Sequence, residues 1–584
     1  MIQTTEERHD VVICGGGLAG LLLARQLRRE LPQLSVLVLE RTSRPLPTAC
    51  HKVGESSVEL ASQYLERMGF TEYLLDEHIV KLGLRFFPGG GELPLVERVE
   101  VGPCAEPVVR SYQLDRGKFE TDLRGFIEED GAKLVEGARV DAVDLSKDDN
   151  DHRVTYTVGD AQKAVTARWV VDATGRNALF RRQLKQTRGL GHAANAGWFR
   201  TPGRVDINDL VPESETEWHE RPCGDERWRS TNHLMGTGYW VWLIPLSTGN
   251  TSIGLVVHDE VHGHKVVSSY DEMFAFLEEH EPQLAELLRD AEPSDYLCLR
   301  KYSHSVGRAW SHERWAMVGE AGAFVDPLYS PGSDFIAIAN CFTTEMIRVE
   351  LDGGDTKAKA MQLNGHYRSM IAGTICLFRG AHDVYGHPDA MATKVFWDNF
   401  TYWSFTCHFF QQDVYRYSAE DYEPFVAIGQ RFLELGDRMQ ELLAAWADLA
   451  PGVQRREFIG APHFPSILID AHTKTGEKMT REELLAYLDL RVPQLEMIAL
   501  EIMLRIVQQL SPEQAKEALE RCKFHTWGIE VTPERIETER MKGHPRRVRL
   551  TTICRDLERT LGKIPYHERV EETREMLLGV TAKA

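Results

Sequence analysis

The feature that most constrains this chain is a glycine-rich turn that joins an apolar strand to a helix near the N-terminus. Glycines 15, 17 and 20 follow the apolar run Val11–Cys14, and a predicted helix continues from Leu18 to about Arg29. Gly15 permits a tight turn, Gly17 lets a pyrophosphate approach the backbone, and Gly20 lets the helix pack against the strand. The free amides of the helix N-terminus then point at the phosphates. The pattern therefore predicts a Rossmann-like α/β domain that binds a dinucleotide.

A second predicted strand, Ser35–Leu39, ends in Glu40, twenty residues after Gly20. An acid at the end of the second strand accepts hydrogen bonds from an adenosine ribose. The strand before the glycines, the helix after them and this acid together make the dinucleotide prediction strong. The predicted contacts at this end of the ligand are Gly15, Gly17, Leu18, Ala19, Gly20, Glu40 and Arg41.

The composition narrows the class of protein and its partners. The chain has 584 residues, of which 42% are apolar and 27% charged, as is typical of a folded globular protein. Its net charge of −20 argues against nucleic acid and against anionic membrane surfaces as partners. The sequence has no run of 18 apolar residues and no signal-peptide pattern at its start, and its ten cysteines form no C-x-x-C pair. A cytoplasmic protein with reduced thiols and no metal site is expected.

The chain is predicted to be α/β, with a β-rich lobe and a mostly helical C-terminal region. The dinucleotide-binding domain is expected to span 1–190 and to return at 311–354, where another buried parallel strand begins. Between these parts, 191–310 is predicted to form a β-rich substrate lobe that contains a hairpin. The last part, 355–584, shows helical periodicity.

Three local predictions concern segments outside the glycine turn. The segment Val80–Phe87 is expected to begin one strand, which would carry Lys81. Helices Pro424–Leu449 and Pro493–Leu510 are each expected to begin at a proline, because the first helical turn tolerates one. Aromatic residues crowd 396–410, which we expect to be core, with a lid over a substrate as the alternative.

Three later segments are predicted to contact the same dinucleotide. A strand ends at Asp172 and is followed by an Ala-Thr-Gly turn that lets backbone approach the ligand. An arginine opens a helix after Asp115 and offers a planar donor to phosphate groups. A third strand end and turn lead into a helix N-terminus, which would face negative charge on the ligand. The predicted contacts in these segments and near residue 56 are Ser56, Arg116, Gly175, Glu320, Asp326, Gly332 and Ser333.

In this order and at these distances, the segments resemble the FAD-binding fold of flavin monooxygenases of the para-hydroxybenzoate hydroxylase type. The resemblance covers roughly residues 8–350 and implies that the dinucleotide is FAD. It implies that Arg116 and Glu320 contact phosphate and ribityl groups, and that 330–332 faces the flavin ring. The family normally has aspartate where this chain has Glu320, so the side chain is one methylene longer here.

Two motifs narrow the resemblance. The strand Trp240–Pro245 matches W-x-W-x-I-P, and Glu55 in a V-G-E-S run is followed 26 residues later by Lys81. Together these motifs resemble the flavin-dependent halogenases. In that family reduced FAD, oxygen and halide form hypohalous acid, which travels through a tunnel to a lysine that delivers halogen to an electron-rich ring. The resemblance implies that Lys81 is this lysine, with Lys52 as the competing candidate.

The residues themselves leave the role of Lys81 open. A lysine in an otherwise apolar strand lies either at a solvated edge or inside the protein, where burial lowers its pKa and makes it a donor or a nucleophile. Trp240 and Trp242 are two residues apart and share one face of their strand, which suits either a core or a tunnel wall. The residues expected along the tunnel and at the substrate are Trp240, Trp242, Tyr329 and Ser330.

Three departures from the family pattern bear on the substrate and the halide. Tyr239 separates the first tryptophan from the glycine that often directly precedes it. Tyr329 occupies the place where the tryptophan halogenases carry a glutamate, which points away from free tryptophan and toward another activated ring. Pro331 lacks a backbone N–H near the place where the family binds chloride, and Gly332 and Ser333 remain as donors.

The predicted function is halogenation, within secondary metabolism, of an electron-rich aromatic substrate of the phenol, pyrrole or indole type, with chloride or bromide as the halide. The chain shows no second dinucleotide motif, which fits FADH2 supplied by a separate flavin reductase. The substrate is either free or tethered to a carrier protein, and the oligomeric state is left open. The alternatives are an FAD-dependent monooxygenase or oxidoreductase on the same scaffold and a non-catalytic flavin-binding protein.

Overall fold

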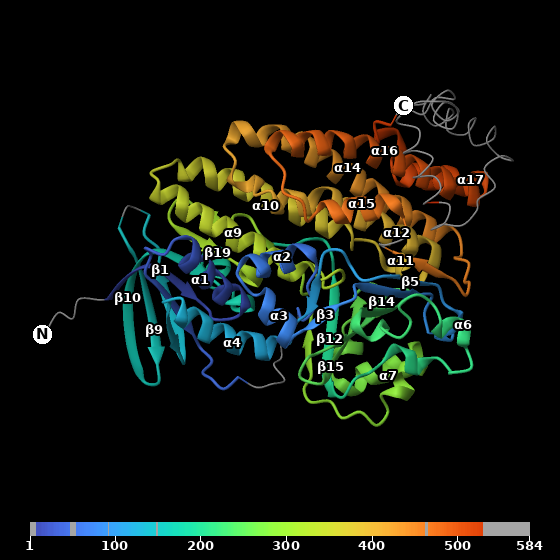
Figure 1. Ribbon diagram of the computed structural model, residues 1–584, viewed down its shortest axis with the longest axis horizontal. Helices are drawn as coiled ribbons and strands as arrows, with labels where there is room; N and C mark the ends of the chain where they lie inside the picture. Colours follow the sequence, from blue (N-terminus) through green and yellow to red (C-terminus); the bar gives the residue numbers. More distant parts are fainter. Residues whose placement is uncertain are drawn as a thin grey trace, which may run out of the picture.

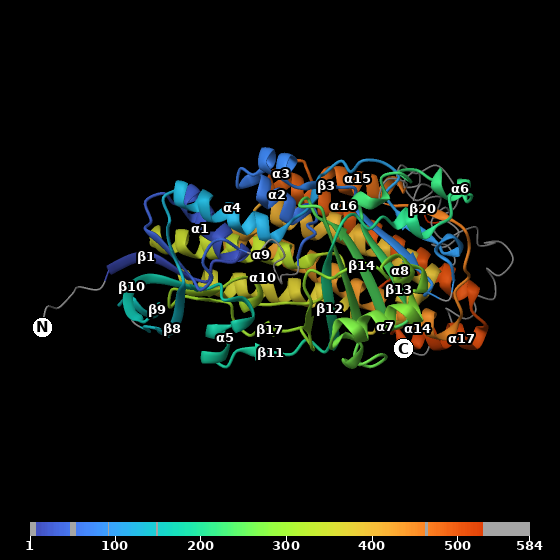
Figure 2. The ribbon, with the colours of Figure 1, turned by 90° about the horizontal axis from the view of Figure 1, so that it is seen from below.

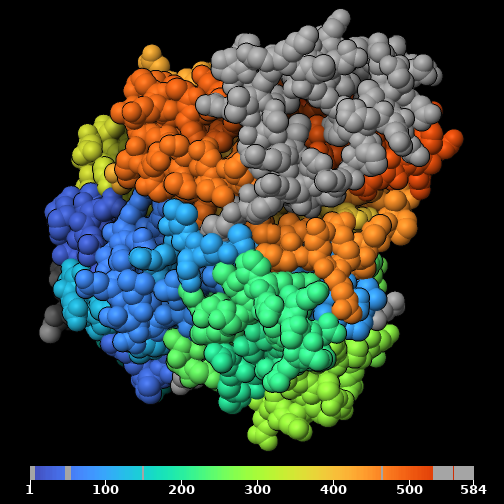
Figure 3. All heavy atoms as spheres, turned by 45° about the vertical axis from the view of Figure 1, so that its right-hand side comes forward, coloured from blue at the N-terminus to red at the C-terminus, as the bar shows by residue number. Residues whose placement is uncertain are grey.

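The structure is a computed structural model in which a layer of long helices lies across two β-sheets (Figure 1). The two sheets lie side by side, and the view from below shows the same order (Figure 2). In the space-filling view the C-terminal helices, in orange, sit on the N-terminal domain in blue and on the β-rich lobe in green (Figure 3). The structure describes residues 7–46, 54–91, 93–147, 150–461, 465–529 and Leu557.

The first sheet is mainly parallel and carries the glycine turn. Residues Val11–Cys14 of β1 and Val36–Leu39 of β2 are continuous apolar runs, as expected of parallel strands that are covered on both faces. Helix α1 (Leu18–Glu30) follows β1 directly, so the predicted strand–turn–helix–strand unit and the α/β class are confirmed. The parallel strands are, in spatial order, β19 (Trp315–Met317), β10 (Ala161–Asp172), β1 (Glu7–Cys14), β2 (Val36–Glu40) and β7 (Lys133–Glu136). The antiparallel additions are β8 (Ala138–Asp144), β9 (His152–Val158) and β18 (Trp310–Ser311).

The second sheet forms the β-rich lobe. Strands β14 and β15 form the predicted hairpin. Alternate residues of β14 enter different cores: Trp240 and Trp242 pack in the large core, whereas Val241 and Leu243 pack in a smaller one with helix α7 (Tyr270–His280). The two tryptophans therefore share one face, as predicted. The strands of this sheet are, in spatial order, β16 (Leu297–Leu299), β12 (Ala194–Pro202), β15 (Asn250–His258), β14 (Tyr239–Pro245), β13 (Thr231–Gly236), β4 (Leu84–Pro88), β5 (Glu100–Gly102) and β20 (Phe458–Gly460).

The expectation of a single strand at Val80–Phe87 is wrong. The chain forms two strands, β3 (Ile79–Lys81) and β4 (Leu84–Pro88), with Gly83 between them at a φ of +132°. Strand β3 pairs with β6 (Ser111–Gln113) in a two-stranded sheet, whereas β4 joins the second sheet. The positive φ, which glycine adopts without strain, turns the chain from one sheet to the other. This break separates β3, which ends at Lys81, from the second sheet, and β3 is labelled close to β12 in Figure 1.

Long helices form the layer above the sheets, so the described part of the C-terminal region, up to residue 529, is mostly helical, as expected. Among the described residues, we find no helix that is both long and apolar enough to cross a membrane. The long helices are α9 (Pro331–Leu351), α10 (Thr356–Cys376), α12 (Pro388–Thr401), α14 (Ala419–Leu449) and α16 (Arg481–Gln509). Shorter helices include α2 (Glu59–Arg67), α4 (Arg116–Glu129) and α15 (Ser466–Lys474).

The two helices expected to begin at Pro424 and Pro493 begin earlier, so this prediction is wrong. Helix α14 starts after the N-cap Ser418, and α16 starts after a capping box formed by Thr480 and Glu483. These caps satisfy the free amides of the first turn. Both prolines lie inside their helices, where each removes one backbone hydrogen bond.

Candidate active site

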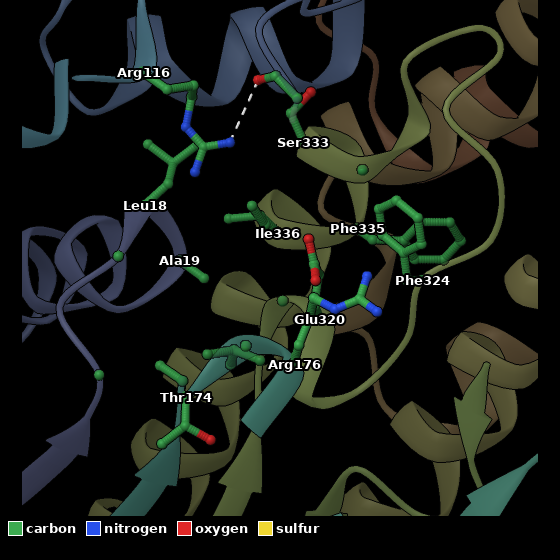
Figure 4. Close-up of a pocket in the computed structure, with 18 of the residues that line it drawn as sticks. Leu18, Ala19, Arg116, Thr174, Arg176, Glu320, Phe324, Ser333, Phe335 and Ile336 are labelled. Atoms are coloured by element: carbon green, nitrogen blue, oxygen red, sulfur yellow. Dashed lines mark hydrogen bonds between the residues drawn. The ribbon is translucent and has the colours of Figure 1, made fainter. Parts of the chain in front are cut away.

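A cavity of about 830 Å³ lies at the carboxyl ends of the parallel strands of the first sheet. Open α/β sheets bind their ligands at this edge. Residues of the α1 N-terminus, of the turn at Thr174 and of helix α9 surround the same space (Figure 4). The predicted cofactor residues that line the cavity are Gly15, Gly17, Leu18, Ala19, Glu40, Arg41, Ser56, Arg116, Gly175, Glu320, Asp326, Gly332 and Ser333.

The three glycines of the opening motif have different surroundings. Gly15 has a φ of +114°, and a Cβ there would collide with the carbonyl oxygen of Ala173. A Cβ on Gly20 would collide with the carbonyl oxygen of Gly15, so the helix and the strand pack at a distance that only glycine allows. A Cβ on Gly17 would meet no atom within 4 Å, although Gly17 lines the cavity. Gly20 thus contributes to packing, whereas Gly17 borders open ligand space.

Glu40 holds the glycine turn from the end of β2. Its Oε2 accepts a hydrogen bond from the Gly16 amide at 2.6 Å, and its Oε1 accepts one from the Thr42 amide at 2.7 Å. A carboxylate oxygen has two lone pairs, so each can also accept from a ribose hydroxyl. The N-cap of α1, Gly17, has no side-chain hydrogen bond to the helix, and the first turn contains no acid. The amides of this turn can therefore bind an anion.

Arg116 opens helix α4 at the cavity wall. Asp115 caps the helix by accepting hydrogen bonds from the two amides that follow Arg116. The guanidinium donates to Glu120 Oε1, with Nη2 at 2.5 Å, and lies 3.5 Å from the Gly54 carbonyl oxygen through Nη1. These contacts fix the plane of the guanidinium, which suits bidentate recognition of phosphate oxygens.

The return segment brings Glu320, Gly332 and Ser333 to the same wall. Just before Gly332 and Ser333 in the chain, Tyr329 and Ser330 both adopt left-handed backbone conformations, with φ of +65° and +57°. Such conformations cost non-glycine residues of the order of 1 kcal/mol each and gather at ligand sites. This pair turns the chain into α9, whose N-cap makes no side-chain hydrogen bond to the helix. A second helix N-terminus is thus directed toward the cavity.

Asp326 lines the cavity, but protein donors already occupy its carboxylate. His192 Nε2 lies 2.8 Å from Oδ2, the Tyr302 hydroxyl donates to the same oxygen at 2.7 Å, and the Leu328 amide donates to Oδ1 at 3.0 Å. The side chain therefore fixes the loop before α9. A contact between this residue and a cofactor would come from its backbone.

The residues of this cavity fit FAD. Gly17, Gly175 and Gly332 each leave open space where a Cβ would lie, so a ligand can approach the backbone at three points. The buried indole N–H of Trp240, which also lines the cavity, has no hydrogen-bond partner within the described residues. The starts of α1 and α9 offer amides to anionic groups. The volume of about 830 Å³ lies in the range of pockets for large organic ligands.

A row of aromatic rings leads away from this cavity. The rings of Trp240 and Trp242 are 5.7 Å apart, and His233 lies 5.6 Å from Trp240. His233 in turn stacks on Phe86 at 4.7 Å. Burial lowers the pKa of His233 to about 3, so this ring is neutral at physiological pH. Trp240, Trp242 and His233 line the first cavity and Phe86 lines a second one, so the row joins the two.

The second cavity, of about 900 Å³, lies beneath the C-terminal helices and has a mainly apolar wall. Tyr329 lines this cavity, whereas its neighbour Ser330 lines the first. The aromatic segment 396–410 contributes to both core and wall, because Phe396 and Phe400 are buried in the core while other rings face the cavity. The aromatic wall residues from this segment are Trp397, Tyr402, Trp403, Phe405 and Phe409.

Lys81 lies at the boundary between the two cavities. Its side chain is fully buried and lines the second cavity. Its Nζ donates to Ser56 Oγ at 2.8 Å and to the Ser57 carbonyl oxygen at 2.9 Å. Since Ser56 lines the first cavity, one hydrogen bond connects the two walls. Burial lowers the pKa of Lys81 to about 7, against the opposing charges of Glu59 and Asp334. The competing Lys52 lies outside the described residues.

Sequence reasoning missed four residues around Lys81. Asp334 accepts hydrogen bonds from the Tyr402 hydroxyl at 2.7 Å and from an amide of α2 at 2.9 Å, yet burial raises its pKa to about 7. Glu59 lies 3.2 Å from His472 Nε2. Burial raises the pKa of this carboxyl, but His472, a backbone hydrogen bond and the charge of Lys81 together lower it below its ordinary value. An acid in the first turn of an otherwise apolar helix was an available signal for Asp334. No local pattern connects His472 in α15 with this site.

Comparisons with known proteins agree with this geometry. Residues 8–259 match the family model described as FAD binding domain. Together with the sheet and the cavity, this match defines an FAD-dependent oxidoreductase. The chain is 27% identical over 430 residues to "Flavin-dependent halogenase chlA" of Dictyostelium discoideum, covering 68% of this chain and 70% of that protein. It is 22% identical over 351 residues to a 1H-pyrrole-2-carbonyl-(peptidyl-carrier protein) brominase of Pseudoalteromonas luteoviolacea, covering 60% and 79%. Over these parts the chain is similar to flavin-dependent halogenases.

Solved structures of halogenases share the fold. The halogenase PltM in complex with phloroglucinol and FAD superposes with a TM-score of 0.59 at 17% identity, covering 84% of this chain and 96% of PltM. The flavin-dependent halogenase CmlS superposes with a TM-score of 0.53 at 20% identity, covering 80% of this chain and 77% of CmlS. The likeness to PltM extends beyond the FAD-binding part, since it covers most of both chains.

Proposed function

We propose that this protein halogenates an electron-rich aromatic ring, with FAD in the first cavity, the ring in the second and Lys81 as the residue that delivers the halogen. The observation that carries the proposal is the position of the Lys81 ammonium. It is buried, faces the second cavity and is hydrogen-bonded to Ser56, which faces the first. A lysine whose pKa burial lowers to about 7 can donate and accept a proton near neutral pH.

The first cavity is proposed to hold FAD along its length. The turn at Gly15–Gly20, with Glu40, would bind the ADP half. Arg116 and Glu320 would bind phosphate and ribityl oxygens. The backbone of 330–333 would face the flavin ring, and the Gly332 and Ser333 amides would donate to the halide. Bound there in reduced form, which a separate flavin reductase would supply, FAD would provide the chemistry that converts oxygen and chloride or bromide into hypohalous acid.

Lys81 is proposed to hold hypohalous acid by its hydroxyl oxygen while the ring attacks the halogen. The oxygen–halogen bond breaks as the carbon–halogen bond forms, and the ammonium proton turns the departing hydroxide into water. The ring then loses its proton and becomes aromatic again. Asp334 is a buried carboxyl group whose charge acts on Lys81, and we assign it as the acceptor of that proton. Its raised pKa suits proton transfer near neutral pH.

The substrate is proposed to be a phenol, a pyrrole or a similarly activated ring rather than free tryptophan. Tyr329 lines the second cavity at the chain position where the tryptophan halogenases carry glutamate. The name of one relative specifies a pyrrole on a carrier protein, and one similar structure contains phloroglucinol; both rings are electron-rich. Either a free or a carrier-tethered substrate is consistent with this comparison.

Purified protein is expected to bind FAD and to brominate resorcinol when supplied with a flavin reductase, oxygen and bromide. Mass spectrometry would detect the product by its bromine isotope pair, and omission of bromide should remove it. An oxygenated product that forms without halide would instead indicate a monooxygenase. Protein that fails to bind FAD would contradict every flavin-dependent role proposed here, including a non-catalytic one.

Asp334→Asn is expected to move the pH profile of halogenation. A nearby carboxylate stabilises the ammonium, so its removal lowers the pKa of Lys81 further. The limb of kcat/KM that reports Lys81, expected near pH 7 in the wild type, should move to lower pH by about one unit. The measurement is product formation from about pH 5 to 9. Asp398→Asn changes a different carboxylate of the second cavity and is the matched control. In this variant the pH of the kcat/KM limb should not change. An unmoved limb in Asp334→Asn would contradict the coupling.

A further inference from the structure

The second cavity is much longer than one aromatic ring. Its wall follows α10 from Ala358 to Cys376 and α14 from Ala419 to Gly436. At a rise of 1.5 Å per residue, these two stretches are about 27 Å and about 26 Å long. Helices α10 and α14 lie side by side in the upper layer (Figure 1). The cavity therefore continues as a groove between these helices, several times the length of a six-membered ring.

Glycines keep this groove open. Gly436 on α14 is buried, yet a Cβ there would meet no atom within 4 Å. Gly365 on α10 likewise has open space where a Cβ would lie, and both glycines line the cavity. Nearer the C-terminal end of α10, a Cβ on Gly373 would only reach ordinary contact with Leu433, at 3.6 Å. A leucine side chain at 365 or 436 would therefore enter the groove.

The ends of the groove differ in chemistry. Lys81 and Asp334 are buried and mark the place of reaction. At the N-terminal halves of the two helices the groove reaches solvent, because Met361 is 70% exposed and Val426 is 49% exposed. Between these ends the wall is mainly apolar. A ligand that spans the groove thus needs a polar, reactive end and an apolar extension.

We propose that the substrate is an electron-rich ring that carries a long unbranched apolar chain, with the ring beside Lys81 and the chain in the groove between α10 and α14. This inference rests on the proposed halogenation. Each methylene that leaves water for an apolar wall adds to affinity. A phosphopantetheine arm is a poorer occupant, because burying its amide groups against a mainly apolar wall costs free energy wherever they find no hydrogen-bond partner.

The test compares resorcinol with its 4-ethyl, 4-hexyl and 4-dodecyl derivatives on the FAD-loaded protein. Equilibrium dialysis measures binding, and bromination with a flavin reductase measures kcat/KM. We expect 4-hexylresorcinol to bind at least about tenfold more tightly than 4-ethylresorcinol. Equal binding across the series would overturn the inference, even if every ring is brominated. If the wild type binds the long chains selectively but brominates no ring, the inference about the groove is supported and the proposed halogenation is contradicted.

Gly436→Leu and Gly365→Leu place a side chain in the groove from opposite helices. Each is expected to remove the preference for long chains while resorcinol itself is still brominated at a rate within about twofold of the wild type. Two positions are used because loss of folding at one would leave the other as a test. Glu434→Leu, on the exposed side of α14, adds the same side chain outside the groove and should keep the preference. Retained preference in both glycine variants would overturn the inference.

Discussion

Lys81→Met is expected to reduce halogenation by about 10³-fold or more without loss of FAD binding. Methionine fills a similar volume, so the wall between the two cavities is retained. It cannot donate to Ser56 Oγ or to hypohalous acid. The measurements are brominated product by mass spectrometry and FAD affinity by fluorescence. Bromination of an added scavenger in solution should persist, because the oxidant still forms in the first cavity.

Lys394 provides a matched control for this prediction. It is also fully buried, but its ammonium lies 2.8 Å from Asp398 Oδ2 and donates to Gln440 Oε1 at 2.6 Å, so its partners satisfy it. Lys394→Met is expected to retain halogenation and to lower the Tm, because it leaves a buried carboxylate unpaired. The reverse pattern, with activity lost at Lys394 and kept at Lys81, would show that the wrong lysine has been assigned.

Stability against pH gives an independent readout of Lys81. Its pKa is about 7 in the folded protein and 10.5 in an unperturbed lysine. Between these values the unfolded chain binds a proton that the folded protein does not, so this group makes stability rise with pH. The rise should be smaller in Lys81→Met than in the wild type. An identical dependence in both proteins would mean that the lysine is not buried as described.

The cofactor half of the site could be predicted from sequence because its signals are local. The turn at Gly15–Gly20, the acid Glu40 and the strand end before Gly175 each lie within a few residues of the element that positions them. Chain topology then brings these segments to one sheet edge. Gly15, Gly17, Glu40 and Gly175 line one cavity, and their roles toward FAD are predictions.

The surroundings of Lys81 could not be predicted in the same way. The resemblance predicted a role for the lysine. The charges of Glu59 and Asp334, which act on it, come from α2 and α9, and His472, which contacts Glu59, comes from α15; no local pattern connects these helices. The split of β3 from β4 depends on a backbone turn at Gly83 that looks like an ordinary glycine in an apolar run. The starts of α14 and α16 were predicted at prolines, which the first turn of a helix tolerates. The chain instead begins each helix earlier, at the N-caps Ser418 and Thr480.

Substitution of the motif glycines should separate binding of FAD from stability of the fold. Gly17→Val is expected to weaken FAD binding by at least about 100-fold while the protein still folds. The backbone of Gly17 is extended, with φ −84° and ψ −175°, which valine also adopts. The new side chain meets no protein atom within 4 Å of its Cβ and occupies the space beside the α1 amides. It therefore displaces the pyrophosphate and leaves helix α1 in place.

Gly20→Val should instead reduce the stability of the fold. Its Cβ would collide with the Gly15 carbonyl oxygen, so strand and helix must separate and stability should fall by about 3 kcal/mol or more. Thermal melting of the apoprotein and FAD fluorescence titration distinguish the two variants. Gly125→Val on α4, where a Cβ also meets nothing, lies away from the cavity and should leave FAD affinity unchanged. If Gly17→Val bound FAD as the wild type does, the pyrophosphate could not lie against this turn, and the first cavity would need a different ligand orientation.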